Sequence, residues 1–229
     1  MPTSALADHR PASAFEQARF NMVEQQIRPW DVLDASVLEL LYLVRREEFV
    51  PPAMRTLAFS DLELPIGEGQ CMLQPKLEAR ILQELAPGKT ERVLEIGTGS
   101  GYLTALLAHR AQHVLSVELR PTLKAMAEEN LSRHGCDNVT LAIGDGSRGW
   151  NTNQYFDVIV LGGSTPILDQ RLLAQLKPGG RLFAVVGEAP VMQAKLIQCS
   201  LPGVYSEKVL FETVIPKLVN APAPARFQF

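Results

Sequence analysis

Cysteine and histidine are scarce in this chain of 229 residues, and positive charge is not in excess. The three cysteines, Cys71, Cys136 and Cys199, lie far apart and form no C-x-x-C pair. This spacing excludes a disulfide framework and a zinc cluster, and it indicates a reduced, intracellular protein without a metal. The formal net charge is −3, which gives no sign of a basic surface for nucleic acid or membranes.

Long apolar runs are absent as well. No run approaches the roughly 20 residues of a membrane-spanning helix, and the first residues, MPTSALADHRPAS, lack the apolar centre of a signal peptide. Hydrophobic residues make up 46% and charged residues 21% of the chain, which is ordinary for a globular protein. We therefore expect a cytoplasmic enzyme with one large α/β domain and a small appendage.

The stretch 92–108, RVLEIGTGSGYLTALLA, organises the rest of the chain. It opens with a short β-prone apolar run of the kind that a buried parallel strand shows. Glycines follow at alternate positions, at Gly97, Gly99 and Gly101, and they let a ligand approach the backbone closely. A helical pattern begins near Ser100, so its free N–H groups would face the same place. The stretch predicts a nucleotide-type pocket at the carboxyl end of the strand.

Small differences decide which nucleotide this loop suits. The dinucleotide fingerprint G-x-G-x-x-G requires a glycine at position 102, where the chain has Tyr102. Glu95 would repel a pyrophosphate but suits a cation, and S-adenosylmethionine carries both an ammonium and a sulfonium group. E-x-G-x-G-x-G therefore predicts an S-adenosylmethionine loop, with Thr98 and Ser100 between the glycines. The alternative is a glycine-rich turn without a ligand.

Two further acidic residues end later strands. Glu118 ends the predicted strand 113–118, 21 residues after Gly97, near the spacing at which such folds place an acid on the ribose hydroxyls. Asp145 lies between two glycines at the end of the predicted strand 139–146, where it can accept from an adenine amino group. The alternatives are an exposed charge for Glu118 and an ordinary Asp-Gly turn for Asp145. The predicted cofactor-binding residues are Glu95, Gly97, Thr98, Gly99, Ser100, Gly101, Glu118, Leu119, Asp145 and Gly146.

The N-terminal part shows helical patterns and no strand alternation. Apolar spacing predicts a helix over 15–27, and Asp34 can cap a second helix. Between this cap and the core, the segment 58–85 contains a loop with two glycines, and Pro75 is suited to begin a helix there. The loop is either a simple connection or part of the active site, and we expect it to line the active site.

The second half alternates strands and helices. Further strands are predicted at 156–163 and 181–187 with a helix over 168–176 between them, and 194–201 and 208–216 are expected as antiparallel strands at the sheet edge. The predicted organisation is a disordered N-terminus (1–13), a helical cap with the substrate loop (14–88), an S-adenosylmethionine-binding core (89–219) and a C-terminal tail (220–229).

Six stretches carry a family resemblance that runs from about Met22 to Leu218. They read MVEQQI (22–27), REEFVPPAMRTLAFSDLELPIGEGQ (46–70), VLEIGTGSGY (93–102), SVEL (116–119), GDGSRGW (144–150) and QLKPGGRL (175–182). On these motifs the chain resembles the protein-L-isoaspartate O-methyltransferases. The resemblance implies a Rossmann-like class I methyltransferase fold, an α/β fold with a seven-stranded, mostly parallel sheet, helices on both faces and an N-terminal helical cap. It also implies S-adenosylmethionine as donor, an isoaspartyl protein or peptide as acceptor, and a C-terminal strand that helps to bind the peptide.

One motif departs from the family's pattern. The family reads GQTIS, one further residue and a proline, where this chain has Gly69-Gln70-Cys71-Met72-Leu73-Gln74-Pro75. The family's threonine is Cys71 here, and its active-site serine is Leu73, which offers no hydrogen bond to an isoaspartyl carboxylate. Two alternatives stay open: a small-molecule acid or another peptide as acceptor, or a cofactor-binding protein without catalysis. The substrate loop is residues 69–73, no catalytic residue is assigned, and a monomer or weak dimer is expected.

Overall fold

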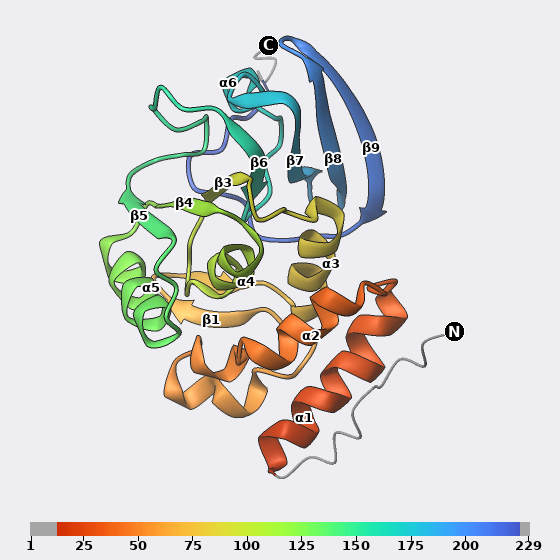
Figure 1. The fold of residues 1–229 in the computed structure, drawn as a ribbon, viewed down its shortest axis with the longest axis vertical. Helices are drawn as coiled ribbons and strands as arrows, with labels where there is room; N and C mark the ends of the chain where they lie inside the picture. The colour runs from red at the N-terminus through yellow and green to blue at the C-terminus, as the bar shows by residue number, and fades with distance from the viewer. Residues whose placement is uncertain (1–12, 225–229) are drawn as a thin grey trace, which may run out of the picture.

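A seven-stranded sheet forms the centre of the molecule (Figure 1). The computed structural model describes residues 13–224. The strand order in the sheet is β5-β4-β3-β6-β7-β8-β9. The strands are β3 (Arg92–Ile96), β4 (His113–Glu118), β5 (Val139–Ile143), β6 (Phe156–Leu161), β7 (Leu176–Glu188), β8 (Val191–Leu201) and β9 (Val204–Glu212).

Five strands of this sheet are parallel, from β5 to β7, whereas β8 and β9 extend its edge in antiparallel pairs. The seven-stranded sheet and the antiparallel edge are therefore confirmed. Parallel strands end at the same side of a sheet, so the carboxyl ends of β3, β4, β5 and β6 lie next to one another. The functional site is built on this edge.

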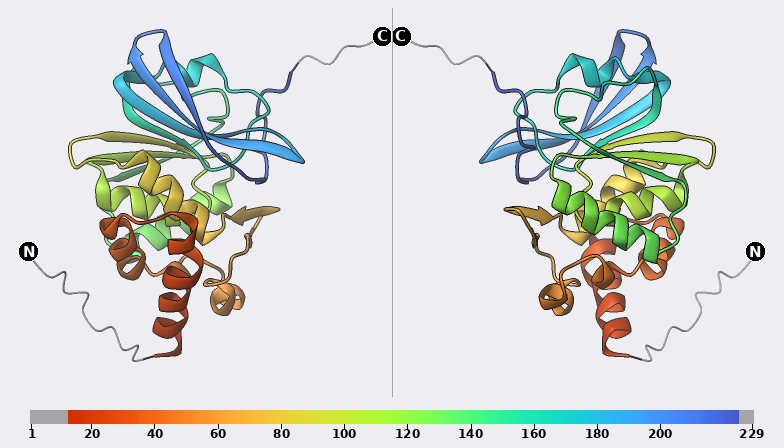
Figure 2. Two further views of the ribbon diagram at one scale, coloured as in Figure 1. Left: turned by 90° about the vertical axis from the view of Figure 1, so that its right-hand side faces the viewer. Right: turned by 90° about the vertical axis from the view of Figure 1, so that its left-hand side faces the viewer.

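Helices lie on both faces of the sheet, although unequally (Figure 2). Two hydrophobic clusters fill the faces: Val93 and Val158 belong to the helix-rich cluster, and Leu94 and Ile159 pack on the other side with α6. Neighbouring strand residues thus serve opposite faces, as the pleat requires. The helices are α1 (Ala14–Met22), α2 (Ala35–Leu43), α3 (Pro75–Leu85), α4 (Tyr102–Arg110), α5 (Pro121–Arg133) and the short α6 (Gln170–Leu173).

The N-terminal helices follow from their local signals. The predicted helix over 15–27 is α1, which continues into a π-helical turn, η1 (Val23–Ile27). Asp34 caps α2 as predicted, because its carboxylate accepts from the backbone N–H groups of Ser36 (2.8 Å) and Val37 (3.4 Å). Pro75 begins α3, also as predicted. Short 3-10 turns, η2 (Arg28–Trp30), η3 (Arg46–Glu48) and η4 (Pro52–Leu57), connect these helices.

The loop expected around two glycines is a β-hairpin. Strand β1 (Leu64–Gly67) pairs antiparallel with β2 (Gln70–Met72), and residues 67–69 turn the chain with positive φ values. The helical cap before this segment has no strand among its described residues, as expected, but the interpretation of the glycine-containing segment as a loop without strands was wrong. These strands have four and three residues, which is too short for an alternating pattern to stand out.

The helix predicted over 168–176 is also shorter than expected. Only Gln170–Leu173 is helical, and Leu176 already belongs to β7, where it pairs with Phe156 of β6. The disorder predicted for 1–13 lies outside the described residues except for Ser13, which caps α1; the last five residues of the predicted tail lie outside them too. In the described part of the chain, no helix has the length and apolar character needed to cross a membrane.

Candidate active site

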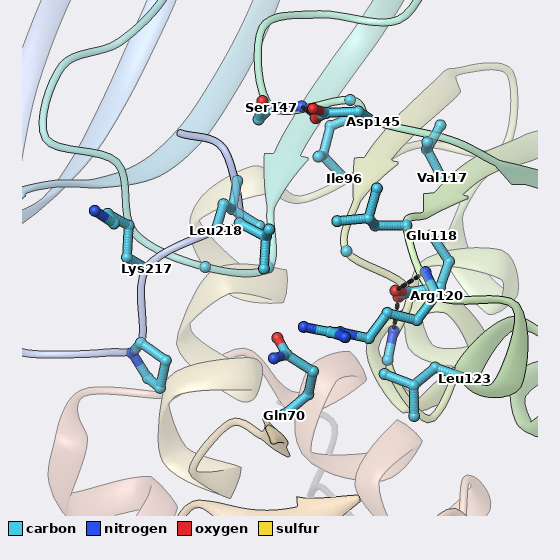
Figure 3. A pocket seen from close by; sticks show the side chains of 18 of the residues that line it. Gln70, Ile96, Val117, Glu118, Arg120, Leu123, Asp145, Ser147, Lys217 and Leu218 are labelled. Carbon is cyan, nitrogen blue, oxygen red and sulfur yellow. Dashed lines mark hydrogen bonds between the residues drawn. The ribbon is translucent and has the colours of Figure 1, made fainter. Parts of the chain in front are cut away.

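A cavity opens at the carboxyl edge of the parallel strands (Figure 3). Its empty volume is about 730 Å³, a value that includes the open solvent at its mouth. The walls come from the ends of β3, β4, β5 and β6, from the hairpin β1–β2 and from the segment 216–219. The ligand site predicted at this edge thus has a matching cavity.

Glu118 ends β4 with both carboxylate oxygens fixed. One oxygen accepts a hydrogen bond from the backbone N–H of Gly99 (2.9 Å) and the other from that of Arg120 (3.0 Å) (Figure 3). The residue is only 5% exposed and lines the cavity. Each carboxylate oxygen can accept more than one hydrogen bond, so this group is held ready to accept from two hydroxyls of a ligand. The neighbouring Leu119 lines the cavity as well.

Two of the three loop glycines open the end of β3 to the cavity. Gly97 and Gly99 line it, with φ values of +96° and +56°. At the end of β6, a Cβ on Gly162 would lie 2.7 Å from the carbonyl oxygen of Gly97, so the two strand ends approach closely. Gly101 does not line the cavity, because it begins α4 and packs against Ala127 of α5. The glycine pattern therefore serves both ligand access and helix packing.

Glu95 does not reach the cavity, contrary to the expected contact with a cation. Its side chain is fully buried, and one carboxylate oxygen accepts from the hydroxyls of Thr104 (2.5 Å) and Ser116 (2.6 Å). Burial raises the pKa of Glu95 to about 8. The pleat of β3 turns this side chain towards α4, so Glu95 ties β3, β4 and α4 together beneath the glycine loop.

Thr98 and Ser100 are buried beside this group. The hydroxyl of Thr98 lies 2.6 Å from that of Ser116, and the backbone carbonyl of Ser100 accepts from the amide of Asn130 (2.9 Å). Both line a small adjoining cavity instead of the main one. The hydroxyl of Thr98 and the backbone carbonyl of Ser100 anchor the loop, and Gly97 and Gly99 line the main cavity.

Asp145 follows β5 and lines the cavity next to Glu118. It accepts from the backbone N–H of Ser147 (2.9 Å) and from the side-chain amide of Asn220 (2.9 Å). Burial raises the pKa of Asp145, but these hydrogen bonds outweigh burial and hold the pKa below its ordinary value. Gly146 also lines the cavity, and a Cβ there would lie 2.5 Å from the side chain of Ile96. A charged acceptor and a closely packed glycine therefore meet at this end.

The predicted substrate loop forms the opposite wall. Gln70, Cys71 and Leu73 line the cavity, whereas Gly69 at the hairpin turn and the buried Met72 do not. Burial raises the pKa of the Cys71 thiol to about 11, so this group stays protonated and does not act as a nucleophile. Leu73 is 6% exposed and presents hydrocarbon to the cavity.

A buried arginine fixes the backbone of this wall. Arg46 is fully buried and donates to the carbonyl of Leu73, to the carbonyl of Ala58 (2.9 Å) and to the carboxylate of Glu78. Its guanidinium also lies 5.1 Å from the ring centroid of Tyr102. Sequence reasoning did not single out Arg46, because nothing local marks an arginine whose partners lie 12 to 32 residues away.

The last part of the wall was only broadly anticipated. The segment 216–219 returns to the sheet after β9, where the backbone N–H of Leu218 donates to the carbonyl of Ser164 (2.9 Å). A Cβ at Gly163 would lie 3.1 Å from Leu218. The glycine pair Gly162-Gly163 is the one local signal that a second segment packs against the end of β6.

The lining of the cavity fits S-adenosylmethionine. It combines a fixed acceptor pair at Glu118, a charged acceptor at Asp145, open backbone at Gly97 and Gly99, and apolar side chains from Ile96, Val117, Leu119, Leu123 and Leu218. A nucleoside requires these components: acceptors for hydroxyls and apolar walls for the base. Among the described residues, no group of three histidine, cysteine, aspartate or glutamate side chains is arranged to hold a metal ion.

A comparison with protein families matches residues 17–216 to the model described as Protein-L-isoaspartate(D-aspartate) O-methyltransferase. The chain belongs to this family. Protein-L-isoaspartate O-methyltransferase 1 of Syntrophobacter fumaroxidans is 39% identical over 189 residues, which cover 82% of this chain and 88% of that protein. The Protein-L-isoaspartate O-methyltransferase of Myxococcus xanthus is 46% identical over 156 residues, which cover 68% and 74% of the two chains.

Solved structures confirm the fold. A chain from Plasmodium falciparum in complex with S-adenosyl-L-homocysteine has a TM-score of 0.75 and 20% identity, and the match covers 86% of this chain and 96% of that one. A protein-L-isoaspartate O-methyltransferase has a TM-score of 0.74 and 25% identity, over 89% and 65% of the two chains. The chain is therefore an S-adenosylmethionine-dependent O-methyltransferase of the protein-L-isoaspartate type with the class I α/β fold.

Proposed function

We propose that the cavity holds S-adenosylmethionine against the ends of β4 and β5 and receives an isoaspartyl carboxylate from the side of the hairpin β1–β2. The observation that carries this assignment is the Glu118 carboxylate, fixed by two backbone N–H groups at one wall of the cavity. Glu118 accepts from the ribose hydroxyls, and Asp145 accepts from the adenine amino group. Gly97 and Gly99 let the remainder of the cofactor lie against the backbone of the loop.

When bound, S-adenosylmethionine supplies a methyl group activated by the positive sulfonium. The α-carboxylate of an isoaspartyl residue is already ionised at neutral pH, so the protein does not need a general base. Its residues align the acceptor and exclude water from it. Leu73 and Leu218 supply apolar surface for this purpose, and the protonated Cys71 thiol beside them carries no competing negative charge.

Leu73 also favours a second candidate. Its hydrocarbon side chain lines the acceptor wall at the position where the family resemblance assigns a serine. An acceptor that needs no hydrogen bond there, such as a small-molecule acid or a different peptide carboxylate, fits this wall.

The acceptor is tested by transfer of labelled methyl from S-adenosylmethionine to a synthetic isoaspartyl peptide. Its normal aspartyl twin is the control, and cofactor binding is measured separately by calorimetry. We expect selective labelling of the isoaspartyl form. Labelling of small acids but not of the peptide would favour the second candidate, and tight cofactor binding without transfer to any acceptor would contradict the proposal.

We further propose that residues 14–88 act as a cap on a core formed by residues 89–219. The support is that the hairpin of the first part supplies one wall of the cavity and strand ends of the second part supply the other. The three cysteines are free thiols, which suits a reducing cytoplasm. Sedimentation of the purified protein tests the expected monomer or weak dimer.

A further inference from the structure

One cation in the cavity has no part in the assignments above. Arg120 lies between β4 and α5 and lines the cavity, and its side chain extends towards Gln70 of the hairpin (Figure 3). Among the described residues its one ion-pair partner is Glu68 at the hairpin turn, with 3.6 Å between Nη1 and Oε2. That distance is too long for a hydrogen bond, so the guanidinium retains its donors.

The hairpin wall itself offers little to a carboxylate. Leu73 has no hydrogen-bond donor. The thiol of Cys71 donates to the carboxylate of Glu63, with 3.6 Å between Sγ and Oε2. The side-chain amide of Gln70 donates weakly, at 3.4 Å, to the carbonyl of Glu68. An anionic acceptor on this wall therefore requires a strong donor from elsewhere in the cavity.

The charges of the cavity lead to the same requirement. Glu118 and Asp145 both line it, and their negative charge opposes the approach of an anion. Lys217 is the other cation in the lining, but its ammonium group points away from Gln70 and Arg120 (Figure 3). The guanidinium of Arg120 is the cation that faces the hairpin wall, and its N–H groups can donate a charge-assisted hydrogen bond to one oxygen of a carboxylate.

We propose that Arg120 is a specificity-determining residue that binds the carboxylate of the methyl acceptor. This inference rests on the proposed function, because it assigns the acceptor end of the same cavity. The guanidinium holds one carboxylate oxygen and leaves the other free to form the new bond to the methyl carbon, while the carbon–sulfur bond breaks and its electron pair stays on sulfur. Glu68 holds the side chain over the mouth until the acceptor takes its place.

The test compares the two halves of the ion pair. Arg120→Gln removes the cation, Arg120→Lys keeps the charge without the guanidinium, and Glu68→Gln removes the competing anion but keeps Arg120. Arg28→Gln, on η2 and outside the cavity lining, is the control for loss of one positive charge. The readouts are the Kd of S-adenosyl-L-homocysteine by calorimetry, the Kd of a fluorescent isoaspartyl peptide by anisotropy with S-adenosyl-L-homocysteine present, and KM and kcat for methylation of the same peptide.

We expect Arg120→Gln to raise the peptide Kd and KM about 10-fold, the loss expected for one charge-assisted hydrogen bond in a partly exposed site. The Kd of S-adenosyl-L-homocysteine stays within about 2-fold. Arg120→Lys recovers part of the peptide affinity, and Glu68→Gln leaves it unchanged or improves it. If Arg120 only held the hairpin in place through Glu68, the result would differ. Arg120→Gln and Glu68→Gln would then weaken peptide binding to the same extent.

Two results would overturn the inference. One is wild-type peptide affinity in Arg120→Gln; the other is equal loss of peptide affinity in Arg120→Gln and Glu68→Gln. Failure of the proposed function looks different: the wild-type protein would bind S-adenosyl-L-homocysteine but neither bind nor methylate the isoaspartyl peptide, and the inference would fall with it.

Discussion

The buried carboxyl group of Glu95 makes the stability of the fold depend on pH. The group is fully buried, and burial raises its pKa from about 4.5 to about 8. Between these values the folded protein keeps the proton that the unfolded chain releases. The free energy of unfolding therefore falls as the pH rises through this window. Glu95→Gln replaces the protonated carboxyl group by a neutral amide of similar shape and removes this contribution.

The size of the effect follows from the two pKa values. One titrating group changes the free energy of unfolding by about 1.4 kcal/mol for each pH unit inside the window. Between pH 5.5 and pH 8.5 the contribution of Glu95 to the free energy of unfolding changes by about 3 kcal/mol. The dependence flattens near pH 8, where the folded protein also begins to lose this proton. Glu78, whose pKa burial raises to about 7 beside Arg46, adds a similar dependence that ends about one pH unit lower. The difference between wild type and Glu95→Gln isolates Glu95, because both proteins carry Glu78.

Urea unfolding followed by tryptophan fluorescence measures this directly. Wild type and Glu95→Gln are compared at pH 5.5, 7.0 and 8.5, with Glu129→Gln on the surface of α5 as the control. We expect the variant to gain about 3 kcal/mol relative to wild type from the lowest to the highest pH. Parallel pH profiles of wild type and Glu95→Gln would refute the reasoning, because they would mean that Glu95 titrates alike in the folded and unfolded states.

Three further predictions concern the cavity. Glu118→Gln raises the Kd of S-adenosyl-L-homocysteine at least 10-fold in calorimetry, because the amide turns a donor towards the N–H of Gly99 or Arg120; an unchanged Kd would remove Glu118 from the ligand site. Cys71 reacts slowly with iodoacetamide at pH 8, because a pKa of about 11 leaves about one thiol in a thousand ionised; fast labelling at this residue would contradict that burial. Leu73→Ser raises kcat/KM for an isoaspartyl peptide roughly 10- to 100-fold and lowers the free energy of unfolding by about 2–3 kcal/mol; a loss of stability without a gain in rate would show that the hydroxyl is not what this pocket lacks.

Features with strong local chemistry were predictable from the sequence. Pro75 fixes the start of α3 because a proline suits the first turn of a helix, and Asp34 begins α2 because its carboxylate satisfies free N–H groups. The glycine spacing after β3 and the acidic residue at the end of β4 located the cavity for the same reason. Each is a local sequence pattern that spans only a few residues. Their roles towards the cofactor stay predictions.

Features that depend on distant partners were not predictable. The position of Glu95 at a strand end suggested access to the ligand, but its direction depends on which face of the sheet carries α4. The hairpin β1–β2 is too short to show a period, and its pairing appears only when both strands are placed. The packing of Leu218 against Gly163 and the orientation of Arg120 result from tertiary contacts in the same way.

The return of the segment 216–220 to the sheet has a consequence for biosynthesis. This segment closes the cavity only after it reaches the carbonyl of Ser164 and the carboxylate of Asp145, and it is translated after every strand of the sheet. A nascent chain can therefore assemble its parallel core on the ribosome while one wall of its ligand site is still missing. The cofactor then stabilises the finished chain by binding to it.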